Sequence, residues 1–213
     1  MSAKNNTQFC HYILRGIIVG DSGVGKSSIL HYLVNKTFKQ LHDLTIGVEF
    51  EQVHFTISDK NNEKKEVKLH IWDTAGLETF QAITQIYFQR CCMVFVVYDV
   101  GNRSSFTKVP NWINTVKRKC KSHVEIILIG NKSDSIRGVT YSEGLECAQS
   151  YGVLFMETSA QNGSNINVIF RRACERIVRY TVEQIPNTLN NGIQRGCLIE
   201  PAEFFTAQSD RVV

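Results

Sequence analysis

A glycine-rich segment near the start of the chain contains the residue types that bind phosphate groups. Residues 20–27 read GDSGVGKS, and the residues that satisfy the pattern GxxxxGK followed by Ser or Thr are Gly20, Gly25, Lys26 and Ser27. Glycines let backbone N–H groups point inward around a phosphate, and Lys26 would supply a fixed positive charge. The Ser27 hydroxyl suits a magnesium ligand, and a helix starting here would add its dipole to the anion site. A plain glycine-rich turn is the alternative, which the strand before and the helix after this segment disfavour.

Two further polar motifs each follow a predicted strand. Asp73, in WDTAG at residues 72–76, is expected near the same phosphates, where its carboxylate can hold magnesium through water. Taken alone, Asp73 or Thr74 could instead cap a helix. In NKSD at residues 131–134, the Asp134 carboxylate can accept two hydrogen bonds from the N1 and exocyclic amine edge of guanine, whereas adenine has no matching donor pair. Asp134 therefore predicts GTP over ATP, although NKSD by itself is also a common turn.

Strand and helix patterns alternate from residue 13 to about residue 180, which is typical of a mostly parallel sheet covered by helices on both faces. Strands are expected at residues 13–19, 53–57, 67–71, 94–98, 126–129 and 154–156, and helical spacing occurs at residues 26–34, 106–120 and 166–177. The second and third strands should form an antiparallel hairpin. The last three are interpreted as central strands buried on both faces, and Pro110 must start or kink its helix.

Composition describes a globular protein. The 213 residues are 43% hydrophobic and 21% charged, with a formal charge of +4 that is dispersed except for a basic run at residues 117–121. We interpret that run as a solvated helix face, so nucleic acid is not an expected partner. The apolar run at residues 91–98 is too short to span a bilayer, and no secretory signal or myristoylation glycine begins the chain, so a cytosolic protein is expected. Seven scattered cysteines and six scattered histidines indicate neither disulfides nor an imidazole metal site.

Five motifs in order carry a resemblance to the small GTPases, specifically the Rab proteins: GDSGVGKS at 20–27, TIGVEF at 45–50, WDTAG at 72–76, GNKSD at 130–134 and ETSA at 157–160. HDLTIGVEF and LIGNKSD look closest to Rab proteins of early secretory (ER/Golgi) traffic. The resemblance implies an α/β P-loop NTPase fold of Ras-like type, a three-layer sandwich with a six-stranded, mostly parallel sheet, one antiparallel strand and five helices. It also implies a GTPase domain at residues 13–180, between a flexible N-terminus at 1–12 and a flexible tail at 181–213.

The same resemblance implies GTP or GDP and Mg²⁺ as ligands. The residues then expected at the nucleotide are Ser22, Gly23, Val24, Gly25, Lys26, Ser27, Ser28, Phe38, Thr45, Gly76, Asn131, Lys132, Asp134, Ser159, Ala160 and Gln161. Ser27, Thr45 and Asp73 are expected to hold magnesium. Lys26, Thr45 and Gly76 would act at the γ-phosphate, and Phe38 would lie against the guanine, with core packing of Phe38 as the alternative.

One departure from the family concerns catalysis. Small GTPases normally have glutamine directly after WDTAG, where its amide orients the attacking water, and this chain has Leu77. The side chain of leucine has no hydrogen-bonding group, which predicts very slow hydrolysis and a long-lived GTP state. The alternative is that Gln81, one helical turn away, reaches the attacking water instead. The hypotheses are therefore a GTPase that cycles between two switch conformations and a GTP-bound platform that hardly turns over. A P-loop kinase or ATPase would share the phosphate loop but would not need NKSD.

The resemblance also sets expectations for partners. Effectors, exchange factors and GTPase-activating proteins should bind a monomer through the switch regions and through the neighbourhood of Phe50, Trp72 and Phe88. Rab proteins usually finish in prenylated cysteines, whereas this chain ends SDRVV with its last cysteine at Cys197, so no lipid anchor is expected. A cytosolic protein, or one peripheral on ER/Golgi or vesicle membranes through a partner, is the resulting expectation.

Overall fold

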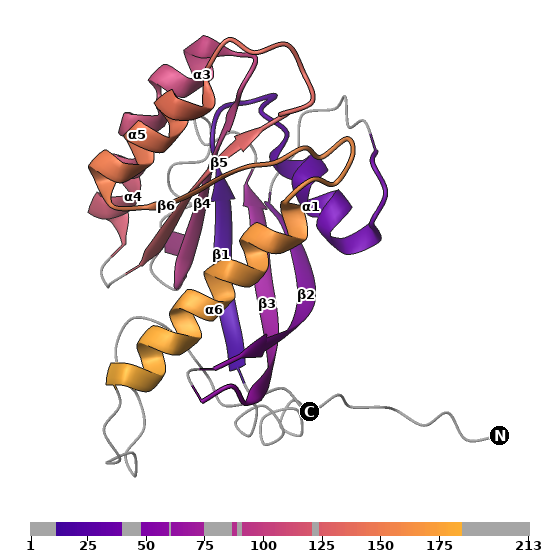
Figure 1. Cartoon of the computed structure of the whole chain (residues 1–213), viewed down its shortest axis with the longest axis vertical. Helices are drawn as coiled ribbons and strands as arrows, with labels where there is room; N and C mark the ends of the chain where they lie inside the picture. The colour runs from indigo at the N-terminus through magenta and orange to yellow at the C-terminus, as the bar shows by residue number, and fades with distance from the viewer. Residues whose placement is uncertain are drawn as a thin grey trace, which may run out of the picture.

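The computed structural model describes residues 12–39, 48–59, 61–74, 87–88, 91–120 and 124–184. The elements in chain order are β1 (Tyr12–Val19), α1 (Lys26–Asn35), β2 (Val48–Ser58), β3 (Lys64–Thr74), β4 (Met93–Asp99), α3 (Arg103–Thr107), α4 (Val109–Lys119), β5 (Glu125–Asn131), α5 (Tyr141–Tyr151), β6 (Leu154–Glu157) and α6 (Ile166–Gln184). Figure 1 shows the sheet between two helical layers, with α1 and α6 on one face and α3, α4 and α5 on the other.

The sheet has six strands in the order β2-β3-β1-β4-β5-β6. Strand β2 pairs with β3 in antiparallel register, with Phe50 opposite Trp72, and every other pairing is parallel. Together with five helices in the described part of the chain, this arrangement confirms the predicted Ras-like α/β fold. Parallel strands place their carboxyl ends, and the loops that follow them, along one edge of the sheet.

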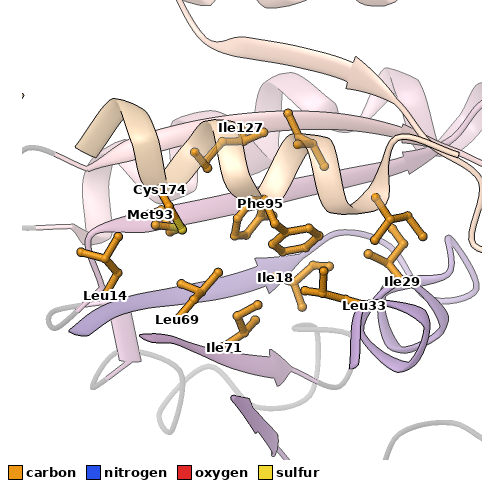
Figure 2. Packing of buried hydrophobic residues seen from close by; sticks show 14 of the residues in the cluster. Leu14, Ile18, Ile29, Leu33, Leu69, Ile71, Met93, Phe95, Ile127 and Cys174 are labelled. Carbon is orange, nitrogen blue, oxygen red and sulfur yellow. The ribbon is translucent and has the colours of Figure 1, made fainter. Parts of the chain in front are cut away.

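Two apolar clusters fill the space on either face of the sheet. The first joins α1 and α6 to the sheet and includes Leu14, Ile29, Phe95 and Phe170, several of which are drawn in Figure 2. The rings of Phe95 and Phe170 lie 4.3 Å apart, so α6 packs directly on the centre of the sheet. The second cluster lies under α4 and α5. Strand β4 contributes to both clusters because its alternate residues point to opposite faces.

Strand β6 differs from the prediction of a strand buried on both faces. It is the last strand in the sheet order, and Leu154, Phe155 and Met156 are only partly buried. An edge position leaves one side of a strand without a neighbour, which a short apolar run in the sequence does not reveal. The other two predicted central strands, β4 and β5, are buried along almost their whole length.

The predicted helix at residues 106–120 is two helices. Helix α3 ends at Thr107, and α4 starts at Val109 with Pro110 in its first turn, where a missing N–H costs no hydrogen bond. Pro110 therefore starts a helix rather than kinking one. Helix α6 continues to Gln184, four residues beyond the boundary expected at Tyr180, and the rest of the predicted tail lies outside the described residues, as does the N-terminal segment before Tyr12.

Among the helices of the described residues, none combines the length and the apolar composition that a membrane span requires.

Helix α5 has no apolar stripe in the sequence, and its packing explains why. A capping box starts it: the Thr140 hydroxyl accepts a hydrogen bond from the Glu143 N–H, and the Glu143 carboxylate accepts one from the Thr140 N–H. The residues that it buries are Gly144 and Ala148, which are both small. The helix thus approaches β6 closely through small side chains, and this kind of contact has no hydrophobic periodicity.

Gly144→Ala should destabilise the protein although alanine is the better helix former. A Cβ at this position would lie 2.5 Å from both the Tyr98 hydroxyl and Phe155 Cζ, and a Cβ at Gly130 would lie 2.7 Å from the same hydroxyl. Because buried Tyr98 is confined between two backbones, overpacking should exceed the propensity gain of about 1 kcal/mol. Urea unfolding should show a net loss of about 1–2 kcal/mol, whereas the exposed control Ser142→Ala should be near neutral. A more stable Gly144→Ala protein would contradict this packing.

Candidate functional site

The phosphate loop, residues 20–27, joins the end of β1 to the start of α1. Gly20 and Gly25 have φ values of 144° and 95°, which side-chain-bearing residues rarely adopt, and a Cβ at either would collide with the Val97 carbonyl oxygen or Asn131 Nδ2. Gly25 is the residue that caps the N-terminus of α1, and no side chain caps that end. The helix therefore presents its first N–H groups to the loop, which is the arrangement that favours an anion.

Lys26 lies inside this loop. Its Nζ donates to the backbone oxygens of Gly20, at 2.9 Å, and Asp21, at 2.8 Å, and the residue is 7% exposed. Burial lowers the pKa of Lys26 below its ordinary value, and the negative charges of Asp73 and Asp21 act in the opposite direction. A phosphate group in the loop would add further negative charge beside Lys26 and favour its protonated form.

Ser27 and Asp73 meet across the gap between α1 and β3. The Ser27 hydroxyl donates a hydrogen bond to Asp73 Oδ2, while Asp73 Oδ1 is buried and has no hydrogen-bond partner within the described structure. Burial raises the pKa of Asp73 to about 6, an effect that the Ser27 hydrogen bond and the charge of Lys26 oppose. A buried carboxylate oxygen without a partner is costly, and a cation would relieve that cost.

These donors fit the magnesium ion that the fold implies. Oxygen ligands from a hydroxyl and a carboxylate are those that Mg²⁺ takes, together with water and nucleotide phosphates. Ser27 and Asp73 would hold the ion, and when bound it would neutralise negative charge on the phosphates. Thr45, the third expected ligand, lies outside the described residues.

Asn131, the first residue of NKSD, connects the phosphate loop to the rest of the site. Its Nδ2 donates to the Val24 carbonyl at 2.9 Å, and its Oδ1 accepts from Thr158 Oγ1 at 3.2 Å and from the Ala160 N–H at 3.3 Å. Asn131 is 1% exposed, so both ends of its amide are satisfied inside the protein. One buried side chain thereby joins the loops that follow β1, β5 and β6.

Lys132 and Asp134 follow with different roles. Lys132 Nζ donates to the Gly23 carbonyl at 2.7 Å and pairs with Asp99 Oδ2 at 2.7 Å, and its backbone has a φ of 62°. It therefore binds the outer side of the phosphate loop. Asp134, two residues further on, is exposed, so its carboxylate is accessible to a base. The guanine-reading role of Asp134 remains a prediction.

The ETSA segment lies against Asn131 through hydrogen bonds from Thr158 and Ala160. Ser159 and Ala160 are buried beside Asn131, and Gln161 is exposed. The Ser159 hydroxyl accepts the Asn162 N–H at 3.2 Å, and the Ser159 carbonyl accepts the Gly163 N–H at 2.8 Å. These internal bonds fix the loop that the sequence assigned to reading the base.

The remaining expected residues fall into two groups. In the phosphate loop and α1, Ser22 and Gly23 are exposed, Val24 is buried and Ser28 is partly buried. Phe38 is 43% exposed, which removes the core-packing alternative for this ring. The expected residues that lie outside the described part of the chain are Thr45, Gly76, Leu77 and Gln81, so their roles stay predictions.

An aromatic surface is formed by exposed Phe50 on β2 together with the partly buried rings of His70 and Trp72 on β3 and of Tyr87. The Phe50 ring is 5.4 Å from Trp72 and 5.1 Å from His70, and Trp72 is 5.7 Å from Tyr87. Phe88, expected in this group, is instead a core residue with 1% exposure. Adjacent residues in a helical turn point in different directions, and Tyr87 is the partly exposed member of this pair.

Several residues that support the site were missed from the sequence. Asp99 at the end of β4 pairs with Lys132, and Thr158 bonds Asn131. Arg137 forms two hydrogen bonds, of 2.8 and 2.6 Å, with the carboxylate of Glu157 and so ties the loop after NKSD to ETSA. The sequence signal that could have identified Asp99 is its position directly after the predicted strand at residues 94–98. That signal does not identify Lys132 as its partner.

The raised pKa of Asp73 predicts a pH dependence of stability in protein freed of nucleotide and metal. Its folded-state value, about 6, exceeds the ordinary 3.8, so the folded state binds the proton more tightly. Protonation of Asp73 therefore adds to the free energy of unfolding; this contribution is complete below about pH 4 and is lost as the pH rises through about 6. Between pH 4.5 and pH 7.5, the free energy of unfolding of the wild-type protein should therefore fall by about 2 kcal/mol relative to that of Asp73→Asn.

Urea unfolding of both proteins in a chelator at the two pH values measures this difference, because the other titrating groups cancel between them. If the difference in unfolding free energy between the two proteins does not change with pH, the pKa of Asp73 is not raised in the folded state.

Comparison with protein-family models gives one finding that bears on this geometry. The model of the Ras family matches residues 15–179, a range that runs from β1 into α6 and contains the phosphate loop, Asp73, NKSD and ETSA. Members of this family are small GTPases that bind GTP or GDP with Mg²⁺ and interact with effectors and regulators. Together with the sheet order and the loops at its carboxyl edge, the match shows that this chain belongs to the Ras family of small GTP-binding proteins.

Proposed function

We propose that this protein is a Rab-like guanine-nucleotide switch that acts in intracellular vesicle traffic. The observation that carries the proposal is the connection made by Asn131, which links the phosphate loop directly to the motif containing Asp134 and to ETSA. A phosphate site and a base site held by one buried side chain suit a ligand that has both parts. The exposed carboxylate of Asp134 selects guanine for that base.

The Rab assignment has separate support in the aromatic surface of Phe50, Trp72 and Tyr87. Phe50 is 50% exposed, and its ring forms one contiguous group with Trp72 on β3 and with Tyr87. In the sequence this group flanks both expected switch segments. Exposed aromatic groups of this kind mark protein-binding surfaces. Effectors therefore bind here and at the switches, and exchange factors and GTPase-activating proteins act at the same region of a monomer, residues 13–180 forming the GTPase domain.

Leu77 makes hydrolysis slow in this proposal. Without an amide beside the γ-phosphate, the attacking water has no positioning partner, whereas the groups that bind the nucleotide are unaffected. The same residue favours a second candidate function, a constitutively GTP-bound platform for effectors with negligible turnover. In either case the protein is cytoplasmic or peripheral on ER/Golgi or vesicle membranes.

Leu77→Gln should accelerate single-turnover GTP hydrolysis by at least tenfold, because it restores a donor and acceptor for the attacking water. Purified wild-type protein should accordingly contain mainly GTP, and the variant mainly GDP, when the bound nucleotide is extracted and identified by chromatography. Gln81→Ala should leave the wild-type rate unchanged. Equal rates in wild type and Leu77→Gln would refute the role given to Leu77, and loss of the residual rate in Gln81→Ala would transfer that role to Gln81.

Asp134→Asn should change base selectivity without removing phosphate binding. An asparagine amide places a donor where the guanine amine needs an acceptor, whereas the 2-oxo group of xanthine can accept from that donor. Competition against labelled GDP should show at least a hundredfold loss for GDP and a gain for xanthosine diphosphate. Asp99→Asn is the matched control, because Asp99 contacts Lys132 rather than the base site, and it should keep the preference for guanine. An Asp134→Asn protein that still prefers GDP would exclude Asp134 from base reading.

A further inference from the structure

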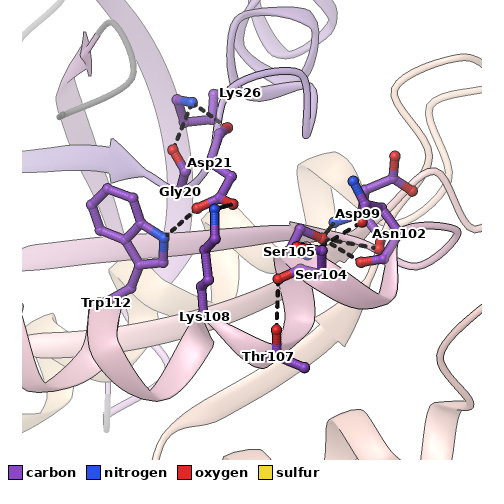
Figure 3. Close-up of polar contacts among 10 residues, drawn as sticks. All are labelled: Gly20, Asp21, Lys26, Asp99, Asn102, Ser104, Ser105, Thr107, Lys108 and Trp112. Atoms are coloured by element: carbon purple, nitrogen blue, oxygen red, sulfur yellow. Dashed lines mark hydrogen bonds and ion pairs between the residues drawn. The ribbon is translucent and has the colours of Figure 1, made fainter. Parts of the chain in front are cut away.

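Asp21, the second residue of the phosphate loop, points its side chain away from the expected phosphate position and toward α4. Its backbone carbonyl accepts from Lys26 Nζ, whereas its carboxylate receives two groups from the other side (Figure 3). Trp112 Nε1 donates to Asp21 Oδ1 at 3.0 Å, and Lys108 Nζ pairs with Asp21 Oδ2 at 2.7 Å. The backbone of Asp21 thus contacts Lys26 in α1, whereas its side chain contacts residues of α4 and its N-terminal cap.

Lys108 and Trp112 reach Asp21 together because they are one helical turn apart. Lys108 is the N-terminal cap residue of α4, and the backbone N–H of Trp112 donates to the backbone carbonyl of Lys108 at 3.1 Å. Residues at this spacing lie on the same face of a helix, so both side chains extend toward the loop. Asp21, Lys108 and Trp112 line an open groove of about 230 Å³ between the loop and α4.

The negative charge of Asp21 affects how an anionic ligand binds to this loop. A carboxylate in a phosphate-binding loop would repel a di- or triphosphate, and at short range and partial burial that repulsion is not fully screened. The Asp21 side chain is 14% exposed, so water screens its charge only in part, and the Lys108 ammonium supplies the opposite charge. The indole N–H of Trp112 fixes the carboxylate in this orientation.

We propose that Lys108 and Trp112 are positioning residues for nucleotide binding, which hold the Asp21 carboxylate on the α4 side of the loop. In that position the Asp21 carbonyl is kept at Lys26, and the negative charge is kept away from the phosphates. The proposal rests on the proposed guanine-nucleotide binding, and it assigns to α4 an influence on the rate at which nucleotide leaves.

The test is the dissociation rate of fluorescently labelled GDP from the full chain, with Mg²⁺ and excess unlabelled GDP. Lys108→Met retains the aliphatic chain without the charge, and Trp112→Phe retains an aromatic ring without the N–H. Each should release GDP about three- to tenfold faster than wild type. Lys108→Arg should restore the slow rate, because it returns a cation to the same place. The matched control is Lys117→Met, which removes a charge from the same helix at the Tyr151 ring and should leave the rate unchanged.

A double-mutant cycle separates positioning from general destabilisation of α4. In an Asp21→Asn background the Lys108→Met change should have little further effect, because the carboxylate that Lys108 neutralises is absent. Rates for Lys108→Met equal to those for Lys117→Met, or an equally large effect in the Asp21→Asn background, would overturn the proposal. If wild-type protein does not retain labelled GDP, the proposed function itself fails, whereas normal retention with unaffected variants refutes only the role of α4.

Discussion

The site depends on the buried amide of Asn131. This side chain has one donor group and one acceptor atom, and both are used inside the protein, on Val24 in the phosphate loop and on Thr158 and Ala160 in ETSA. Because a buried amide that lost either partner would remain desolvated and unpaired, the three loops are held in one arrangement. The spatial relation between the phosphate loop, NKSD and ETSA is thereby fixed by contacts within the chain.

The close packing around this amide explains two otherwise unrelated residue choices. A side chain on Gly25 would occupy the position of Asn131 Nδ2, and one on Gly130 would collide with the hydroxyl of Tyr98. Both glycines are therefore needed for close approach, and Gly25 is also needed for its positive φ. The sheet contributes by bringing the ends of β1, β4, β5 and β6 to one edge, where the loops are short enough to touch.

Much of this organisation could be predicted from the sequence, because it depends on local signals. The glycine pattern of the phosphate loop, the alternation of β2 and β3 and the apolar runs of β4 and β5 each have a period or spacing that is visible along the chain. The features that were missed depend on contacts between distant residues. Helix α5 buries Gly144 and Ala148 instead of a large apolar stripe, and β6 is partly exposed because it is an edge strand. Phe88 is a core residue, whereas its neighbour Tyr87 is only partly buried. The partnership of Asp21 with Trp112 joins residues 91 positions apart, and no local pattern encodes it.

The positions of the two tryptophans have a practical consequence for spectroscopy. The chain contains only Trp72 and Trp112. Trp72 lies in the aromatic surface with Phe50 and Tyr87, and the Trp112 indole is bonded to the phosphate loop through Asp21. The molecule therefore carries one intrinsic tryptophan fluorophore in its aromatic surface and another in contact with its phosphate loop. Replacing either one with phenylalanine leaves a single tryptophan. Changes at the aromatic surface and at the phosphate loop can then be followed separately without an attached dye.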